Sequence, residues 1–539
     1  MKRIDENAHD APAAPPPRVE FLNDPDELLD KVLRIAQPHW QVVVEPVSNY
    51  DLRYLDTFDW RLYRAGLTLY ATRHRGRRTL VLATFEGEIR HTAADVKSPA
   101  FARDLPPGQL RDAICAVSEP RRLFAQAPMN IHEQIVRLLN ADEKTVIRLV
   151  LQTRALSKPG RKGAPGCLSP VVRVVPVKGY KKEHATISAL LAESLGPDTT
   201  PQSAFSSAMK SAGLTPGSYK SGLTRPLLPQ MRSDEAIRNI HQMLLHTMLA
   251  NMDGVRRNLD SEFLHDYRVA IRGARALLKQ IKGVFPASEV RHFSNEFKWL
   301  GAATGQVRDL DVYLLKMEDF RAELPADIRV HLQPLDAYLR AHHVKEQRRL
   351  VRTLGSKRYR ALMDGWSRFL SEPVRVEDGS CPGAARPVME LAADRIWSTY
   401  RRVWKRACVI DSTTSTDALH ALRIECKKLR YLLGFFSPLY PPEEMRQLIQ
   451  PLKQLQTNLG DFNDCEVQRL TLQRFANEMH REGLASADSL LAMGRLMDHL
   501  SRQQLDEQRR FQACFASFSL PDNRKRYRRL FKISDKQTH

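Results

Sequence analysis

Five basic or protonatable residues recur at intervals of three and four in the C-terminal half of the sequence. They are His265, Arg268, Arg272, Arg275 and Lys279. On a helix that turns about 100° per residue, this spacing places all five on a stripe roughly 80° wide. Guanidinium groups form bidentate, charge-assisted hydrogen bonds with phosphate oxygens, and lysine acts as a compact point charge. The stripe therefore predicts a binding site for a phosphate-rich anion.

A second stripe follows after an offset of 155 residues. Its members are His420, Arg423, Lys427, Lys428 and Arg430. The same offset aligns further pairs without a gap, namely Pro286 with Pro441, Leu300 with Leu455, Gly305 with Gly460 and Asp309 with Asp464. This agreement indicates an internal duplication of a helical unit. Two such stripes facing each other would line a groove or pore for a polyanion, with Lys298, Arg308 and Lys453 as possible additional contacts.

The alternative interpretation of each stripe is a solvated helix face. Solvated faces usually mix acidic with basic residues, because pairs of opposite sign stabilise the helix. No Asp or Glu occurs between Tyr267 and Ser288, however, and the opposite side of the helix is apolar at Ala274, Leu277, Leu278, Ile281 and Phe285. These observations favour ligand binding. The acidic residues Asp309, Asp311 and Asp464 would either support the cations or form ordinary ion pairs.

Charge and length locate the predicted site. The chain has 539 residues and a formal net charge of +21. Residues 201–539 contain 54 Lys and Arg against 38 Asp and Glu, a surplus of 16, which leaves a surplus of 5 for residues 1–200. An anionic partner is expected for so basic a protein. The polyanion site is therefore expected in the C-terminal part.

The cysteines and the apolar segments indicate the compartment. The seven cysteines are scattered, with no Cys-x-x-Cys motif and no Cys/His cluster at metal-ligand spacing. We expect reduced thiols in a cytoplasmic protein, with no metal site and no cofactor. No apolar run approaches the length of a membrane span, and the N-terminus lacks the apolar core of a signal peptide.

The first 232 residues indicate one mixed domain between flexible segments. Residues 1–17 are polar and then Pro-rich, which predicts disorder, and residues 18–200 predict an α+β domain. Its expected helices are 25–36 and 180–195, and its expected strands are 40–45, 67–72, 79–84, 144–151 and 171–175. Residues 201–232 are rich in Ser, Pro, Gly and Thr and predict a linker with one short helix at 203–212.

Helical periodicity dominates from residue 233 to residue 520, which predicts an all-α bundle. The two repeats are expected at 233–372 and 388–518, and residues 521–539 are expected to form a basic tail. The expected helices are 233–255, 262–283, 288–323, 326–353 and 356–372 in the first repeat, and 388–409, 417–437, 443–479 and 484–515 in the second.

The run from Tyr54 to Leu69 (Tyr-Leu-Asp-Thr-Phe-Asp-Trp-Arg-Leu-Tyr-Arg-Ala-Gly-Leu-Thr-Leu) resembles the CYTH domain, the triphosphate tunnel family. The resemblance implies an antiparallel β-barrel around a tunnel that holds triphosphate and a divalent metal ion. The sequence departs from that family where its chemistry resides. The Glu-x-Glu-x-Lys strand retains only Glu20, and the family's arginines would fall at Tyr70 and Thr72. The lysine would fall near Ala83 or Thr84, and a second Glu-x-Glu pair is replaced around Arg173–Pro176. A degenerate domain without triphosphatase activity is therefore expected.

The C-terminal motifs resemble the CHAD domain over about residues 233–518. The first set is His265-x-x-Arg268-Val-x-x-Arg272-x-x-Arg275 with Gly305-x-x-Arg308-Asp309-x-Asp311. The second set is His420-x-x-Arg423-Ile-x-x-Lys427-Lys428-Leu-Arg430 with Gly460-x-x-x-Asp464. The resemblance implies that a helical bundle binds inorganic polyphosphate, often on polyphosphate granules. Gly273 is a departure, because the family usually has Arg or Lys there.

Three hypotheses follow. The first is a non-enzymatic protein without catalytic residues that binds inorganic polyphosphate, in the cytoplasm and at polyphosphate granules. The second is a metal-dependent triphosphate or polyphosphate hydrolase that uses the N-terminal barrel. The third, a nucleic-acid binder, is disfavoured because the stripes carry few aromatic residues and no standard nucleic-acid motif is present. The sequence does not determine the oligomeric state, the preferred polyphosphate length or the biological purpose of binding.

Overall fold

The computed structural model describes residues 18–20, 25–85, 87–157, 167–195, 201–219, 226–372, 381–411 and 414–532. The predicted disordered segment 1–17 lies outside these ranges. The chain divides into two compact units, residues 1–220 and 221–539. Each unit is described by itself.

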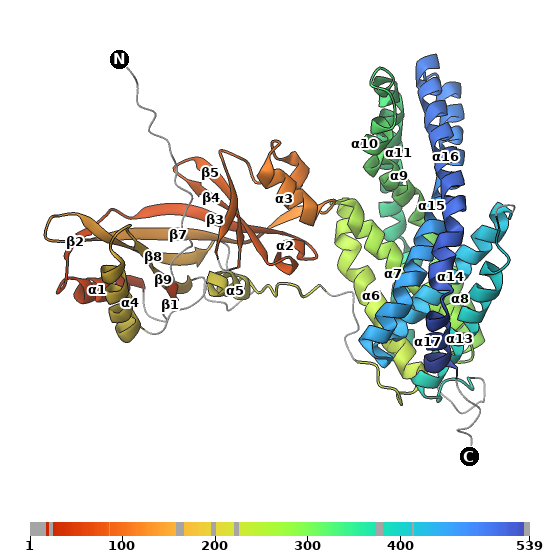
Figure 1. Cartoon of the computed structure of the whole chain (residues 1–539), viewed down its shortest axis with the longest axis horizontal. Coiled ribbons are helices and arrows are strands. Elements are labelled where there is room, and N and C mark those ends of the chain that lie inside the picture. The colour runs from red at the N-terminus through yellow and green to blue at the C-terminus, as the bar shows by residue number, and fades with distance from the viewer. Residues whose placement is uncertain are drawn as a thin grey trace. The chain divides into compact units, whose positions relative to one another are not determined.

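The N-terminal unit is built on one antiparallel sheet (Figure 1). Its strands are β1 (Arg18–Glu20), β2 (Gln41–Val44), β3 (Ser48–Thr57), β4 (Leu67–His74), β5 (Arg77–Thr84), β6 (Ile89–Ala94), β7 (Leu123–Leu139), β8 (Thr145–Leu156) and β9 (Cys167–Pro176). The order is β1-β9-β8-β7-β3-β4-β5-β6, and β2 also pairs with β7. Within the described residues no pairing joins β6 to β1. The expected barrel is therefore an open, curled sheet, a half-barrel.

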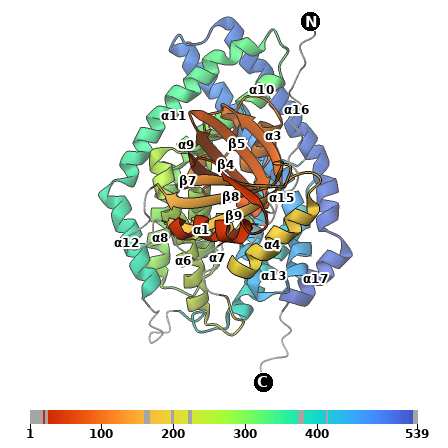
Figure 2. The same cartoon turned by 90° about the vertical axis from the view of Figure 1, so that its left-hand side faces the viewer.

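Short helices surround this sheet. They are α1 (Pro25–Ala36), α2 (Arg61–Arg64), η1 (Ala102–Asp104), α3 (Gln109–Ser118), α4 (Lys181–Leu195) and α5 (Pro201–Ser211). Helices α1 and α4 lie side by side (Figures 1 and 2) and bury Val32, Ile187 and Leu191 against β7, β8 and β9. The predicted helix 25–36 is confirmed, and the predicted strands 67–72 and 79–84 are β4 and β5, which pair as a hairpin.

Several elements of this unit were not predicted, namely β3, β6, β7, α2 and α3. The longest of them is β7, which runs for 17 residues and pairs with β2, β3 and β8. Its apolar residues alternate poorly with polar ones around Pro128, so the period of two is hard to recognise. The short helix expected in the linker is α5, which packs into the N-terminal unit by burying Phe205, Ala208 and Met209. The spacing of these three residues gives the helix one apolar face.

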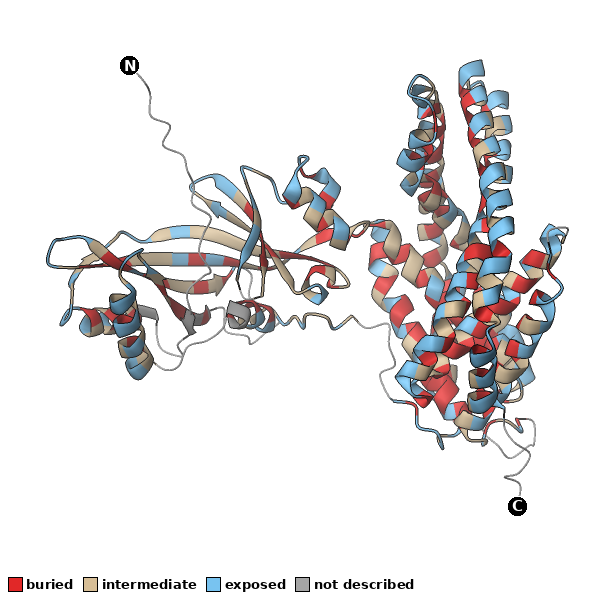
Figure 3. Cartoon of the chain, viewed as in Figure 1, coloured by how far each residue is buried: buried red, intermediate tan, exposed pale blue. Residues whose placement is uncertain are grey.

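The C-terminal unit is all-α, as predicted, and Figure 3 shows buried stripes along its helices. The first repeat contains α6 (Ser233–Arg257), α7 (Ser261–Gln280), α8 (Ala287–Ala303), α9 (Gly305–Leu315), α10 (Met317–Ala322), η2 (Arg329–Leu332), α11 (Gln333–Leu354) and α12 (Lys357–Ser371). The second contains α13 (Val388–Ala407), α14 (Thr416–Phe436), η3 (Ser437–Leu439), α15 (Pro442–Arg481), α16 (Ala487–Phe518) and α17 (Pro521–Phe531). The single helix expected at 288–323 is interrupted at Thr304 and Lys316, whereas its counterpart α15 is continuous.

The structure extends the duplication beyond what the sequence offset indicates. Helices α6 and α13 begin at Ser233 and Val388, again 155 residues apart. Helix α12 packs on α6 and α8, and α17 packs in the same way on α13 and α15. Tyr527 and Phe531 of α17 are almost fully buried. The segment expected to be a basic tail thus contributes the fifth helix of the second repeat up to residue 531.

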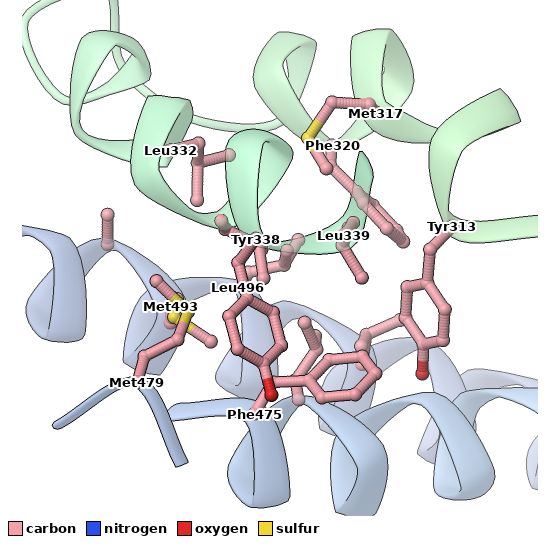
Figure 4. Packing of buried hydrophobic residues seen from close by; sticks show 14 of the residues in the cluster. Tyr313, Met317, Phe320, Leu332, Tyr338, Leu339, Phe475, Met479, Met493 and Leu496 are labelled. Carbon is pink, nitrogen blue, oxygen red and sulfur yellow. The ribbon is translucent and has the colours of Figure 1, made fainter. Parts of the chain in front are cut away.

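A hydrophobic cluster joins the two repeats (Figure 4). Side chains of α9, α10 and α11, including Tyr313, Phe320 and Leu339, pack against Phe475 of α15 and Leu496 of α16. The phenolic hydroxyl of Tyr313 also donates to the carbonyl of Gln468 at 3.2 Å, a residue 155 positions later. Equivalent positions of the two repeats therefore meet across this interface. Within the described ranges, no helix has the length and apolar character needed to cross a membrane.

The close contact of α6 with α7 gives a test of this packing. A Cβ atom at Gly254 of α6 would lie 2.2 Å from the ring of Phe263 on α7, and Phe263 is buried. We predict that Gly254→Ala lowers the free energy of unfolding by about 1–3 kcal/mol through overpacking, measured by urea denaturation. The matched control is Gly494→Ala in α16, where nothing lies within 4 Å. That substitution should be neutral or stabilising, by up to about 1 kcal/mol. Equal effects of the two substitutions would contradict the described α6–α7 packing.

Candidate polyanion-binding site

Helix α7 positions the first basic stripe. The Asp260 side chain caps its start by accepting hydrogen bonds from the backbone N–H groups of Glu262 (2.9 Å) and Phe263 (3.2 Å). The predicted apolar side is confirmed, since Ala274, Leu277, Leu278, Ile281 and Phe285 are all buried. Because that side is fixed in the core, the stripe on the opposite side faces away from the core of the first repeat.

Arg268 anchors α7 to the junction of α8 and α9. Its Nη1 donates to the carbonyl of Gly301 and to Oγ1 of Thr304, both at 2.9 Å. A Cβ at Gly305 would lie 3.5 Å from this nitrogen, and a Cβ at Gly301 would lie 3.4 Å from Nη1 of Arg275. The two glycines therefore let the guanidinium groups approach the helix backbone. The bonds from Arg268 also coincide with the interruption of the helix at Thr304.

The two stripes meet in the structure. We define the central basic cluster as His265, Arg268, Arg272, Arg308, Arg423 and Lys427. Arg272 and Arg308 each interact electrostatically with both His265 and Arg268. Lys427 of α14 interacts with Arg423 on its own helix and with Arg272 on α7. Arg272 and Lys427 occupy equivalent positions of the two repeats, so the two stripes approach each other at these positions.

The cluster perturbs the ionisation of its own members. Burial, reinforced by the charges of Arg423 and Arg272, lowers the pKa of Lys427 to about 8, although Asp464 opposes the shift. Burial and the charge of Arg308 likewise lower the pKa of His265, against the opposing effect of Glu262. Each shift has the sign expected where cations are partly desolvated near other cations. A bound anion would oppose both effects.

Polar residues of α15 orient the second stripe. Nδ1 of His420 lies 2.8 Å from Oδ1 of Asn463, and Nη2 of Arg423 lies 3.0 Å from Oδ1 of Asp464. Nη1 of Arg430 donates to Oε1 of Gln456 at 3.1 Å. Such bonds restrict the rotamers of long cationic side chains before a ligand arrives.

The three acidic residues considered from the sequence have different partners. Asp464 pairs with Arg423, and Asp309 lies near Arg268 and Arg308, whose positive charges lower its pKa. Burial outweighs these charges and raises the pKa of Asp309 overall. Asp311 instead accepts or shares a hydrogen bond with Nε2 of buried His343 at 2.8 Å. Asp309 and Asp464 therefore support the cluster, whereas Asp311 holds α9 to α11 and also interacts electrostatically with Arg268.

Several predicted site residues lie outside the central basic cluster. Lys279, Lys298 and Lys453 are exposed, and no hydrogen bond or ion pair among the described residues joins them to it. Lys428 points to the far side of α14, where it pairs with Glu425 at 2.6 Å. Arg275 lies beside Gly301, at the edge of the first stripe.

Sequence reasoning missed two cations near the site. Arg474 of α15 interacts electrostatically with Asp309, and Lys316, between α9 and α10, interacts with Asp461. Neither belongs to a stripe with helical spacing. Both approach because α9 packs across α15, and the sequence contains no local signal for that crossing.

The unusual glycine of the first stripe has a packing role. A Cβ at Gly273 would lie 3.2 Å from Leu244 of α6 and 3.3 Å from Phe435 of α14. Gln280 of α7 donates to the carbonyl of Lys428 on α14 at 3.3 Å. At the 155-residue offset, Gly273 corresponds to Lys428 and Gln280 to Phe435, so the two contacts are reciprocal. Reciprocal contacts of this kind identify a local two-fold relation between α7 and α14.

The concave face of the half-barrel contains a cavity of about 420 Å³. It is lined at Tyr70, Thr72, Ala83, Thr84 and Arg173, where the CYTH resemblance would have placed charged ligands of triphosphate and metal. Among the lining residues that the structure describes, Glu133 is the only carboxylate, and it accepts hydrogen bonds from Gln152 (2.6 Å) and Tyr50 (3.2 Å). Mg²⁺ and Mn²⁺ need several oxygen ligands. The described lining residues alone supply too few carboxylates to hold a divalent metal ion.

Comparison with known proteins identifies the helical unit. Residues 239–473 match the family model of the CHAD domain. The chain contains a CHAD domain. The match includes every member of the central basic cluster and supports a role related to inorganic polyphosphate.

Three similar proteins cover different shares of this chain. An uncharacterized protein of Mycobacterium tuberculosis is 23% identical over 451 residues, which cover 80% of this chain and 82% of that protein. The crystal structure of the CHAD domain from the plant Ricinus communis is 23% identical, with a TM-score of 0.47, and covers 56% of this chain and 96% of its own. A candidate adenylyl cyclase from Hippeastrum, described as having a dominant triphosphatase activity, is 11% identical, with a TM-score of 0.25. It covers 38% of this chain and 98% of its own.

The lowered pKa of Lys427 predicts how pH affects anion binding. In the free protein this amine loses its proton as the pH rises through about 8. A bound polyanion favours the charged form, so binding takes up a proton above that pH. We predict that affinity for long-chain polyphosphate falls between pH 7.5 and about 9.5, with a limit of tenfold per pH unit for one coupled proton. Lys427→Arg, whose charge is constant in this range, should flatten the profile in fluorescence titrations. A profile unchanged by Lys427→Arg would contradict the assignment of Lys427 as the titrating contact.

Proposed function

We propose that the CHAD domain binds inorganic polyphosphate through the central basic cluster, without catalysing a reaction, and that the protein acts at polyphosphate granules in the cytoplasm. The observation that carries this proposal is the convergence of two duplicated cationic stripes, seen in the electrostatic interaction of Lys427 with Arg272 across the local two-fold. Cations that repel each other at such a position are compensated when a polyanion binds between them.

The chemistry of the cluster suits a chain of phosphoryl groups. Arg268 and Arg423 are oriented by hydrogen bonds and are partly buried, so their guanidinium groups can bind phosphate without losing much conformational freedom. The two stripes contain cationic side chains and the imidazoles of His265 and His420, and they lack Phe, Tyr and Trp, whose larger rings are the usual platforms for stacking nucleobases. The cluster therefore favours polyphosphate over single-stranded nucleic acid.

The N-terminal unit supports the non-enzymatic part of the proposal. The described cavity residues offer one carboxylate, already hydrogen-bonded by Tyr50 and Gln152, where hydrolysis would need a metal site. Their two arginines, Arg154 and Arg173, lie on β8 and β9. We infer that this unit serves as a scaffold or docking surface for the CHAD domain's function.

Loss of charge in the cluster tests the binding site. Arg272→Gln with Lys427→Gln should lower the affinity for long-chain polyphosphate by roughly tenfold to a hundredfold per residue, as for hydrogen bonds to charged groups. The plot of log K against log salt concentration should also become shallower by about 1.4, since each phosphate contact contributes roughly 0.7. Arg272 is exposed, and the Lys427 side chain makes no hydrogen bond to the described residues, so the fold should persist; circular dichroism checks this.

The matched control uses Lys298→Gln with Lys453→Gln. These lysines occupy equivalent positions of the two repeats, are exposed and lie outside the central basic cluster. The control removes the same charge but should change affinity much less. Equal losses in both double variants would assign binding to overall charge rather than to the cluster.

A test for hydrolysis separates the first two hypotheses. We expect no phosphate release from tripolyphosphate or long-chain polyphosphate in the presence of Mg²⁺ or Mn²⁺, followed by a colorimetric phosphate assay. Metal-dependent release that disappears with Glu133→Gln would overturn the non-enzymatic proposal and favour a hydrolase. Phosphate release that persists in this variant and elutes with a contaminant on gel filtration would leave the non-enzymatic proposal standing.

A further inference from the structure

A second cationic surface lies along the contact of α13 with α17. We define the α13–α17 seam by Arg401, Lys405, Arg524 and Arg528, together with the indole of Trp404 between them. Tyr400 of α13 stacks on Tyr527 of α17 with ring centroids 3.9 Å apart, and the guanidinium of Arg524 lies 5.2 Å from the ring centroid of Trp404. These contacts fix how the two helices face each other.

Helical geometry places the four cations on the same side of that contact. Arg401 and Lys405 are four residues apart on α13, on the flank that carries Trp404. Arg524 and Arg528 are four residues apart on α17, on the flank that touches Trp404. The other flank of α17 faces α15, where Arg526 and Arg529 both pair with Glu444. One flank of α17 is thus neutralised by an acid, and the other is not.

The seam cations have few partners in the described parts of the chain. Arg401, Lys405 and Arg528 are exposed, and no ion pair among the described residues includes them. Their neighbours with acidic partners, such as Arg402 with Glu425, point elsewhere. At the 155-residue offset Arg401 corresponds to His246 and Lys405 to Ala250. Packing of the repeat therefore does not require cations at these positions.

Helix α14 separates the seam from the central basic cluster. One side of α14 presents His420 and Arg423 to α15, through Asn463 and Asp464. Its other side presents Glu425 to Arg402 of α13 at 3.0 Å. Positions 423 and 425 point about 200° apart on a helix. The seam and the cluster consequently lie on different sides of α14, so one continuous contact does not cover both.

We propose that the α13–α17 seam binds a second segment of polyphosphate, so that one protein molecule connects two polyphosphate chains. The proposal rests on the proposed function of the central basic cluster and adds a cross-linking role to it. The occupant follows from charge complementarity: four cations with no acid between them on one seam match a flexible chain with about one negative charge per phosphoryl unit. Trp404 is half-buried and already covered by Arg524, which disfavours base stacking and therefore nucleic acid.

The experiment compares the wild-type full chain with a seam variant and a control variant. The seam variant is Arg401→Glu, Lys405→Glu and Arg528→Glu. The control, Arg257→Glu, Arg502→Glu and Arg509→Glu, has the same change of charge at exposed arginines that already pair with adjacent acids. Calorimetric titration with short-chain polyphosphate counts the sites, and light scattering with long-chain polyphosphate detects cross-linking. Circular dichroism and the neutral variant Arg401→Gln, Lys405→Gln and Arg528→Gln guard against misfolding.

We expect two short chains per protein for the wild type and the control, and one for the seam variant, with its remaining affinity changed less than threefold. Scattering by long-chain polyphosphate should fall to the level of a non-cross-linked complex in the seam variant alone. One site in the wild type that Arg272→Gln with Lys427→Gln removes and the seam variant retains would overturn the seam proposal while the proposed function stands. Absence of binding in the wild type would overturn both.

Discussion

The cations of the central basic cluster repel one another, and the packing of the rest of the CHAD domain must offset this repulsion. Burial lowers the pKa of both Lys427 and His265, and neighbouring positive charges lower each pKa further. The packing of α9, α10 and α11 on α15 and α16 opposes this repulsion by burying side chains such as Phe320, Leu339 and Phe475. Each fully buried side chain of this size contributes about 1.5–3 kcal/mol. The repeats are therefore held together by apolar contacts beside the charges, and the charges remain available for a ligand.

Duplication builds both basic stripes from the same helical unit, but the two repeats anchor their cations in different ways. The first stripe is anchored to backbone, because Arg268 bonds the carbonyl of Gly301 and the side chain of Thr304. The second is anchored to side chains, with Arg423 on Asp464 and His420 on Asn463. The backbones of the two repeats differ at the same place, since α15 is one continuous helix and the equivalent run is divided into α8, α9 and α10. A flexible polyanion tolerates this asymmetry, since it offers the same phosphoryl unit to both halves.

The sequence predicted the helices and their basic faces better than it predicted which helices pack against each other. Stripe residues such as Arg272 and Lys427 could be placed on helix faces because their spacing has the helical period, and a gapless offset related the two repeats. Arg474 and Lys316 could not be found, because they approach Asp309 and Asp461 only where side chains of α9 pack against α15, which depends on long-range apolar packing. Lys428 shares the sequence signal of the second stripe, yet its extra rotation of 100° beyond Lys427 takes it to Glu425.

Gly273 shows how a departure from a family pattern acquires a physical reason only in three dimensions. On the sequence it weakens a basic stripe and costs about 1 kcal/mol of helix propensity relative to Ala. In the structure it lies 3.3 Å, measured from its ideal Cβ, from Phe435, and the reciprocal contact of Gln280 with Lys428 holds the other half of the same crossing. A longer cation there would separate α7 from α14 and so move Arg272 away from Lys427. The missing charge is therefore what allows the two remaining charges to approach, and the anion affinity proposed for the cluster depends on that approach.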